Sequence, residues 1–265
     1  MQHWTHPMRR TAILCLGALA WTTGGAAAAS DWIVTVGARA QAVTPYEGAD
    51  YDIFVPTPVI QMRRAGSPER PTLPDDALGV TVASIGGLSF GPALRVRGKR
   101  TGEGRRSGLR GVPLAIEPGG FVSLWPTDWL RGHAEVRKGV HGHSGWIGDA
   151  ALDVVLRDGT WTATFGPRAG WGDHHYMRTY FGVTPAEAAA SRIVTSVYRP
   201  EGGMRYGGVE ATVGRHWSGS WQTTANVGYH RLANGAAQSP IVQYLGSRDE
   251  FSGGVGLKYS FGWTP

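Results

Sequence analysis

Histidines close to small polar residues are the side chains of this sequence whose types and spacing could do chemistry. Asp173, His174 and His175 are consecutive, and His141 and His143 flank a single glycine. Neighbouring histidines on a strand point to opposite faces, so His174 and His175 cannot hold one metal ion without a bend in the chain. His141 and His143 share a face beside a glycine-rich loop and could bind a metal ion only weakly. We therefore predict no metal site and no cofactor.

A serine beside a histidine raises the question of hydrolysis. Ser144 directly follows His143. Some lipid hydrolases are membrane β-barrels, and an enzyme of that class would need such a pair at the outer rim of the barrel. The reaction also requires an acid that orients the histidine, and the sequence identifies none. We predict that the protein is not an enzyme, and we assign no catalytic residue.

Charged residues at every second position form the third candidate group. They alternate with apolar residues and so share one face of their strands; the set is Arg131, His133, Glu135, Arg137, Asp149, Asp153 and Arg157. Such residues could line a pore or neutralise one another. Buried charges need partners, and a barrel of about 10–12 strands leaves little free space between its side chains. We favour the mutually neutralising interior.

The strand pattern that would hold inward-facing residues in place is clearest from Asp249 to Trp263. Small or polar residues occupy one parity there, and the other parity is apolar: Phe251, Val255, Leu257, Tyr259, Phe261 and Trp263. An alternation this long predicts a membrane-crossing strand, because such strands need roughly 9–11 residues whereas strands of soluble proteins run roughly 5–6. Phe251, Tyr259 and Phe261 also resemble the C-terminal signal that the barrel-assembly machinery reads, although the chain continues to Pro265.

Other segments of the chain show the same alternation or read as extended, which predicts an all-β, transmembrane, antiparallel up-and-down β-barrel. Bacterial barrels use an even number of strands, so we expect twelve, with ten as the alternative. Twelve would require a hidden strand, for example at residues 192–198, and ten would mean that two segments within residues 74–99 are misread. Residues 65–76 are expected to form a polar, proline-rich connection. The long extracellular loop 172–203 is expected to hold one short helix that begins at the capping box of Thr184 and Glu187.

Tryptophans stand near the ends of the predicted strands. Those at short turns or terminal ends are Trp32, Trp125, Trp129, Trp161, Trp217, Trp221 and Trp263. Trp146 and Trp171 lie beside loops on the opposite side. Membrane barrels carry such aromatic girdles at their lipid–water interfaces, whereas a soluble sandwich would usually bury its tryptophans in the middle of strands. The pattern favours the membrane barrel.

Composition limits the remaining classes. The chain has 265 residues and a formal net charge of +6 at pH 7, but its basic residues form no run along the strands, so we predict no nucleic-acid partner. Residues 1–29 read as a cleaved secretory signal peptide, which leaves residues 30–265 as the barrel. The single cysteine, Cys15, falls within the signal. No apolar run of about 18 residues follows it, which excludes a helical membrane protein.

The last hairpin resembles a known family. The resemblance rests on residues 229–251 (YHRLANGAAQSPIVQYLGSRDEF) and 253–261 (GGVGLKYSF), with further matches at Tyr46-Glu47-Gly48 and at residues 180–191 (YFGVTPAEAAAS). Together these stretches resemble the MipA/OmpV family over the mature chain, and the resemblance implies an outer-membrane barrel. The best-known member of that family is a scaffold that links a lytic murein transglycosylase to a bifunctional murein synthase. Other members are described as outer-membrane proteins or adhesins, and the family has no catalytic site to carry over.

Two functions of different classes therefore stand side by side. The first is a non-enzymatic scaffold at the murein layer, with outer-membrane lipid, a lytic murein transglycosylase and a murein synthase as partners. The second is a small porin whose lumenal arginine and lysine residues would favour anions. The lipid hydrolase remains as a third and weaker alternative.

Overall fold

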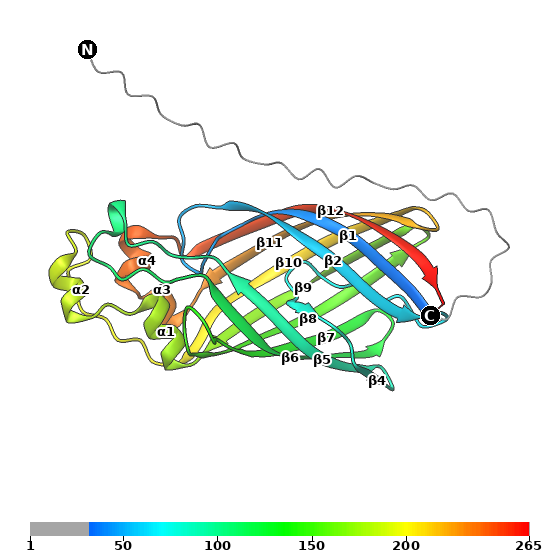
Figure 1. Ribbon diagram of the computed structural model, residues 1–265, viewed down its shortest axis with the longest axis horizontal. Helices are drawn as coiled ribbons and strands as arrows, with labels where there is room; N and C mark the ends of the chain where they lie inside the picture. The colour runs from blue at the N-terminus through cyan, green and yellow to red at the C-terminus, as the bar shows by residue number, and fades with distance from the viewer. Residues whose placement is uncertain (1–31, 265) are drawn as a thin grey trace, which may run out of the picture.

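The fold is one antiparallel β-sheet that curls around a long axis, with helices gathered at one end (Figure 1). The structure is a computed structural model that describes residues 32–264; the predicted signal peptide, residues 1–29, lies outside the described residues. The sheet has twelve strands: β1 (Trp32–Val43), β2 (Ile53–Arg64), β3 (Leu78–Gly79), β4 (Ala83–Ile85), β5 (Leu88–Arg97), β6 (Ala115–Thr127), β7 (Leu130–Lys138), β8 (Trp146–Asp158), β9 (Trp161–Gly172), β10 (Gly203–Ser218), β11 (Trp221–Leu232) and β12 (Asp249–Trp263). The predicted all-β, up-and-down architecture is confirmed.

Strand order follows the sequence except where the last strand meets the first. β12 pairs with β11 on one side and with β1 on the other, in the order β2-β1-β12-β11-β10-β9-β8-β7-β6-β5-β3, with β4 also beside β5. The number twelve agrees with the prediction, but β3 has only two residues and β4 only three. Because both pair with β5, they are pieces of one interrupted strand. Residues 192–198, the proposed hidden strand, contribute only an isolated bridge between Val183 and Tyr198.

The two faces of β12 show why this sequence forms this sheet. Leu257 is 49% exposed and Tyr259 37%, whereas Lys258 between them is 7% exposed. Leu257 lies opposite Ala38 of β1 and Thr223 of β11. An apolar exterior around a small and polar interior is the arrangement that a lipid-surrounded barrel requires. The parity predicted for this strand is confirmed.

Residues 65–77, here called the lumenal segment, run through the interior of the curled sheet. β2 ends at Arg64, and the next strand begins at Leu78, which pairs with Leu94 toward the far end of β5. On the way, Arg70 donates a hydrogen bond to Ser89 (3.0 Å), and the Ala77 N–H donates one to Glu135 (2.7 Å). The sequence predicted a polar connection here but did not place it inside the barrel.

The lumenal segment also explains the two ends of the sheet. β2 and the β3–β4 strand run in the same direction, because the chain returns through the interior between them. Within residues 32–264 no strand ladder joins the two. Pro56 and Pro58 lie on β2, an end strand where a missing N–H breaks few ladder bonds.

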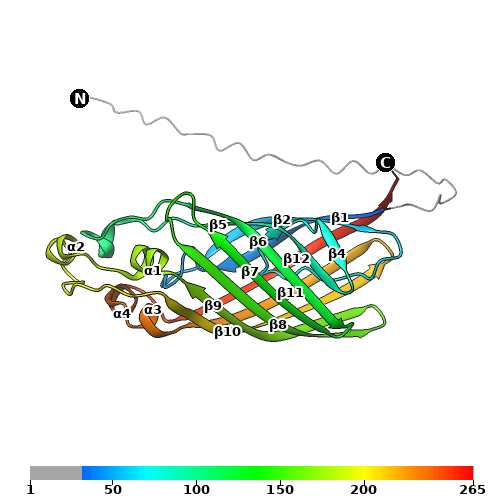
Figure 2. The same ribbon diagram turned by 90° about the horizontal axis from the view of Figure 1, so that it is seen from below.

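A group of helices, here called the cap, covers one end of the sheet, opposite the end where β1 begins and β12 ends (Figures 1 and 2). It contains α1 (His174–Phe181), α2 (Pro185–Ala190), α3 (Asn234–Ala237), α4 (Pro240–Leu245) and the 3₁₀ turn η1 (Gly104–Arg106). The predicted capping box begins α2, with Thr184 and Glu187 each accepting a backbone N–H of the other. The other helices were not predicted. No helix among residues 32–264 combines the length and apolar character needed to cross a membrane.

Candidate functional site

The candidate site is the interior of the barrel, where arginines and carboxylates pair in a continuous network. The ion pairs join Arg95, Arg97, Arg131, Arg137, Arg168 and Arg205 to Glu47, Asp75, Asp76, Glu117, Glu135, Asp149 and Asp153. Most of these side chains are buried. Buried charges are tolerated only when they are paired and hydrogen-bonded, so the pairing is what allows the strands to point so many charges inward.

Two aspartates tie the lumenal segment to the barrel wall. Arg131 on β7 donates from Nη2 to both oxygens of Asp76, at 2.9 and 2.7 Å, and from Nη1 to Asp153 on β8, at 2.9 Å. Arg168 on β9 pairs with Asp75 and, at 2.8 Å, with Asp153. Each arginine therefore bridges one aspartate of the segment to Asp153 of the barrel wall. These four contacts lock the segment in place.

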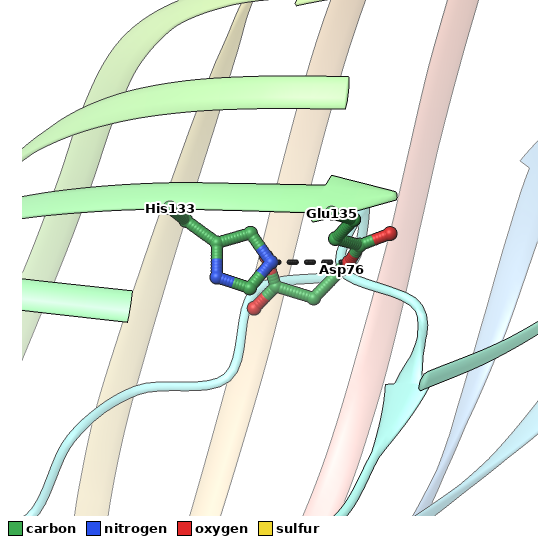
Figure 3. A group of neighbouring side chains, drawn as sticks. All are labelled: Asp76, His133 and Glu135. Atoms are coloured by element: carbon green, nitrogen blue, oxygen red, sulfur yellow. Dashed lines mark hydrogen bonds and ion pairs between the residues drawn. The ribbon is translucent and has the colours of Figure 1, made fainter. Parts of the chain in front are cut away.

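Asp76, His133 and Glu135 converge beside this lock (Figure 3). One potential ligand atom of each lies within 4.8 Å of the others, and His133 Nε2 donates to Glu135 at 3.0 Å. The carboxylates, however, already accept hydrogen bonds from Arg131 and from the Ala77 N–H. A metal ion would have to displace a buried guanidinium group to bind. The arrangement therefore favours an ion-pair junction over a metal centre.

A second layer of ion pairs joins the interior to the cap. Glu117 on β6 pairs with Arg97 at 2.9 Å and accepts a hydrogen bond from His143 at 3.1 Å. The Arg97 guanidinium lies 5.5 Å from the ring centroid of Tyr176 on α1. Burial raises the pKa of Tyr176 well above its ordinary value, so the phenol remains neutral beside the cation. The cap thus rests on this layer and covers that end of the barrel.

Two cavities lie on either side of the lumenal segment. The larger, here called the basal cavity, has a volume of about 710 Å³ and is lined by segment residues 68–74 and by the hairpin residues Gly159 and Gly219. The smaller, of about 290 Å³, lies against residues 74–77 of the segment and Leu78 of β3, and it includes Glu47 and Tyr206 near the cap. The segment separates the two spaces.

The structure places the predicted charged set as follows. Arg131, Glu135, Arg137 and Asp153 are buried, His133 and Asp149 are partly buried, and all six take part in the interior network. Arg157 differs, because it is exposed at the rim and donates to the backbone oxygens of Asp128 and Glu69.

The predicted tryptophan girdle includes one residue that the structure places elsewhere. Trp129, Trp161, Trp217, Trp221 and Trp263 are exposed, Trp32 is half-buried, and Phe251, Tyr259 and Phe261 are exposed on β12. Trp125 is 8% exposed and lies beneath the guanidinium groups of Arg70 and Arg157, 5.6 and 5.9 Å from its ring centroid. Its assignment to the girdle was wrong. Trp125 has the inward parity of Ser123 on β6, which is buried as well.

The histidine pair considered as a metal site belongs to the start of α1. Asp173 is the N-cap of that helix and accepts a backbone N–H at 2.9 Å. His174 and His175 are exposed, with ring centroids 4.0 Å apart. The cluster of potential metal ligands found among residues 32–264 includes neither histidine.

The serine–histidine pair considered for hydrolysis is not assembled. His143 donates from Nε2 to Glu117 and accepts the Gly145 N–H at Nδ1, so both ring nitrogens are engaged. Among the described hydrogen bonds none joins His143 to Ser144, whose side chain is exposed. His141 is exposed and contacts the backbone oxygen of Leu114.

With the fold and the interior described, the chain can be compared with known proteins. Its sequence matches the family model "MltA-interacting protein MipA" over residues 36–261. The chain belongs to the MipA family. The match extends from β1 to β12, and together with the barrel-like sheet it supports an outer-membrane β-barrel protein. No sequence among curated proteins matches significantly.

Several solved outer-membrane proteins resemble this MipA-family chain at low identity. An outer membrane channel from Pseudomonas putida F1 has 10% identity and a TM-score of 0.38, with 89% of this chain and 97% of that chain covered. The NanC porin has 10% identity and a TM-score of 0.36, with 86% and 98% covered. Neisserial surface protein A has 8% identity and a TM-score of 0.27, with 88% and 97% covered.

Several residues of the MipA-family interior were not found from the sequence. Asp75 and Asp76 were assigned to a connection, and Glu117, Arg168 and Arg205 were not singled out. A usable signal existed for the two aspartates. They lie in a loop of a chain whose strands carry an excess of inward basic residues, and buried cations require acidic partners from somewhere.

Proposed function

We propose that this protein is an outer-membrane scaffold whose barrel, filled by the lumenal segment, anchors murein-processing enzymes, and that it acts without catalysis. The lumenal segment is the observation that supports this proposal. It crosses the interior and is fixed by the ion pairs of Asp75 and Asp76, while the cap covers one end. A barrel filled in this way leaves its outer surfaces for binding partners.

The partners in this proposal are a lytic murein transglycosylase and a murein synthase. The description of the matching family names an interaction with MltA. The short turns lie at the end where β1 begins and β12 ends (Figure 1). Since murein enzymes act in the periplasm, we assign the short-turn end to the periplasm and to the docking surface, and the cap to the outside of the cell.

The remaining assignments follow from the membrane location. The apolar outer face contacts outer-membrane lipid, with the exposed tryptophans at the interfaces. The strand that carries Phe251, Tyr259 and Phe261 serves as the signal for the barrel-assembly machinery. Residues 1–29 are removed as a signal peptide on export.

A pull-down with two insertion variants tests the scaffold role. A short epitope inserted after Gly219, in the turn between β10 and β11, should abolish retention of both enzymes by the purified barrel in detergent. The same epitope inserted after Ala189, on the exposed side of α2 in the cap, is the matched control and should leave retention unchanged. Failure of the wild-type barrel to retain any murein enzyme would remove the scaffold role. Loss of binding only with the cap insertion would place the docking surface at the cap and contradict its assignment to the short-turn end.

A small anion-selective porin remains the second candidate, because the basal cavity is lined by Arg39, Arg70, Arg157 and Lys258. Planar-bilayer recording separates the two functions. The scaffold proposal expects a silent wild-type protein, since the lumenal segment fills the path. Stable anion-selective steps from the wild type would instead establish a channel.

A further inference from the structure

The short-turn half of the interior carries positive charge that the protein itself does not neutralise. The basal cavity is lined by the cations Arg39, Arg70, Arg157 and Lys258 and by only two carboxylates, Glu69 and Asp128. Arg70 and Arg157 donate to backbone oxygens and to Ser89. Arg39 and Lys258 are the two remaining cations of this cavity.

Arg39 and Lys258 are close neighbours on the inner face. The register pairs Gly37 of β1 with Lys258 of β12, and Arg39 with Gly256. Arg39 and Lys258 are therefore diagonal neighbours, a spacing of roughly 7–8 Å between backbones. Both are 7% exposed. Among the ion pairs and hydrogen bonds of residues 32–264 neither side chain has a partner, and Arg39 Nε and Nη1 are buried without one.

Uncharged hydrogen-bonding groups converge on the same space. Gln61 Nε2 on β2 and Thr212 Oγ1 on β10 are also buried without a hydrogen-bond partner in the described chain, and both residues line the basal cavity. Thr164 and Thr224, from β9 and β11, add further hydroxyl groups to the lining. Donors from opposite sides of the barrel thus face one cavity.

The acids of the lumenal segment cannot satisfy these donors. Asp75 and Asp76 are held by Arg168 and Arg131 and line the smaller cavity rather than the basal one. Glu69 does line the basal cavity, but its side chain is 52% exposed and lies 3.6 Å from His216. Two adjacent buried cations without an acid are costly, so an anion from outside the chain would stabilise them.

We propose that the basal cavity binds a small polar molecule with an oxyanion group, either a carboxylate or a phosphate. The Arg39 guanidinium supplies a planar donor pair that matches two oxygens of such a group, and Lys258 supplies a second positive charge beside it. Gln61 and Thr212 bind other polar atoms of the same molecule. The volume of about 710 Å³ falls within the range of ligand pockets, roughly 300–1,000 Å³.

Trp125 gives the cavity an apolar wall. Its buried ring lines the cavity together with Pro71, Leu73 and Pro74 of the lumenal segment. An oxyanion bound at Arg39 would therefore have polar donors on one side and an apolar surface on the other. This combination favours an organic anion over an inorganic one.

Calorimetric titration of the purified, folded barrel in detergent at low salt tests the site. The probes are D-gluconate for the carboxylate source, glycerol 3-phosphate for the phosphate of a lipid headgroup, and glucose as the neutral control. We expect saturable binding of at least one of the two anions and none of glucose. The anion that binds more tightly identifies the source. Absence of saturable binding of both anions to the folded wild type overturns the proposal.

Substitutions locate the site. Arg39→Gln should weaken binding by at least about tenfold, the usual effect of losing a hydrogen bond to a charged group, and Lys258→Gln and Thr212→Val should weaken it less. Arg178→Gln is the matched control, because Arg178 is an exposed arginine of the cap paired with Glu201, and it should bind as the wild type does. Heat-modifiable gel mobility shows which variants are folded. If Arg39→Gln does not fold, the Lys258 and Thr212 variants decide, and wild-type affinity in the folded variants refutes the site.

Discussion

Replacing Asp76 by asparagine tests whether the lumenal segment is held by its ion pairs. Asp76 accepts two hydrogen bonds from Arg131, at 2.9 and 2.7 Å, and lies 3.5 Å from His133. The side chains of Asp76 and Arg131 are 7% and 3% exposed, so water does not screen the pair. Asparagine keeps the shape of the side chain but removes its charge.

The expected cost comes from the arginine that is left behind. Removing one partner of a buried ion pair costs about 3–5 kcal/mol, because the remaining charge is buried without compensation. Arg131 still has Asp153 at 2.9 Å, which places the expected loss at the lower end, about 3 kcal/mol. The loss should appear first as release of the lumenal segment, since the strands keep their own ladders.

Urea unfolding in detergent, followed by heat-modifiable gel mobility and tryptophan fluorescence, measures the loss. Asp52→Asn is the matched control, because Asp52 is an exposed aspartate just before β2, and it should change the unfolding free energy by less than about 0.5 kcal/mol. Limited proteolysis between Arg64 and Leu78 should become faster in Asp76→Asn than in either the control or the wild type. If Asp76→Asn matches Asp52→Asn in both stability and cleavage, the ion pairs do not hold the segment.

Three further outcomes are expected. Neutralising Asp75 and Asp76 together should convert a silent barrel into one that conducts in planar bilayers; continued silence would show that other contacts keep the lumen closed. Leu257→Arg should reduce folding into lipid vesicles by about 2–4 kcal/mol if Leu257 lies near the bilayer midplane, and insertion equal to that of the wild type would place this face away from lipid. Burial tends to raise the pKa of Glu187, but hydrogen bonds from Thr184 and Arg110 outweigh it and hold the pKa below its ordinary value. A carboxylate whose pKa is lowered by folding stabilises the folded state at pH values above its unfolded pKa, and this stabilisation is lost as the pH falls through the folded pKa. The backbone amide hydrogens of α2 should therefore exchange with solvent faster under acid conditions. An exchange rate that does not depend on pH, after correction for intrinsic exchange, would contradict the cap geometry.

Strands were predictable here because alternation reports which face of a strand is exposed. β12 shows this at full length, with Leu257 and Lys258 on opposite faces as predicted. The β8–β9 turn was predicted at Asp158-Gly159, and the structure shifts it by one position, with Gly159 and Thr160 as the loop and Gly159 at a φ of 54°. Glycine is favoured there because side chains rarely tolerate a positive φ.

The interior was less predictable, because alternation says nothing about a proline-rich stretch. Residues 65–77 have no strand periodicity, so the strand pattern could not show that Asp75 and Asp76 enter the lumen. Only the excess of inward basic residues on the strands indicated that these acids are needed there. The prediction for Trp125 was wrong for a different reason. It was assigned by its place beside a turn, whereas its parity with Ser123 would have directed it inward.

The position of the lumenal segment decides where the positive charge of the barrel remains. Its aspartates meet Arg131 and Arg168 at the middle of the lumen, so the interior is neutralised there and toward the cap, where Glu47 and Glu117 also supply acids. The residues of the segment that lie below, 68–74, contain only one acid, Glu69. The same element that fills the lumen therefore leaves Arg39 and Lys258 unpaired at the short-turn end. Closure of the lumen and an anion-binding cavity are, on this reasoning, two consequences of how one segment distributes its acids.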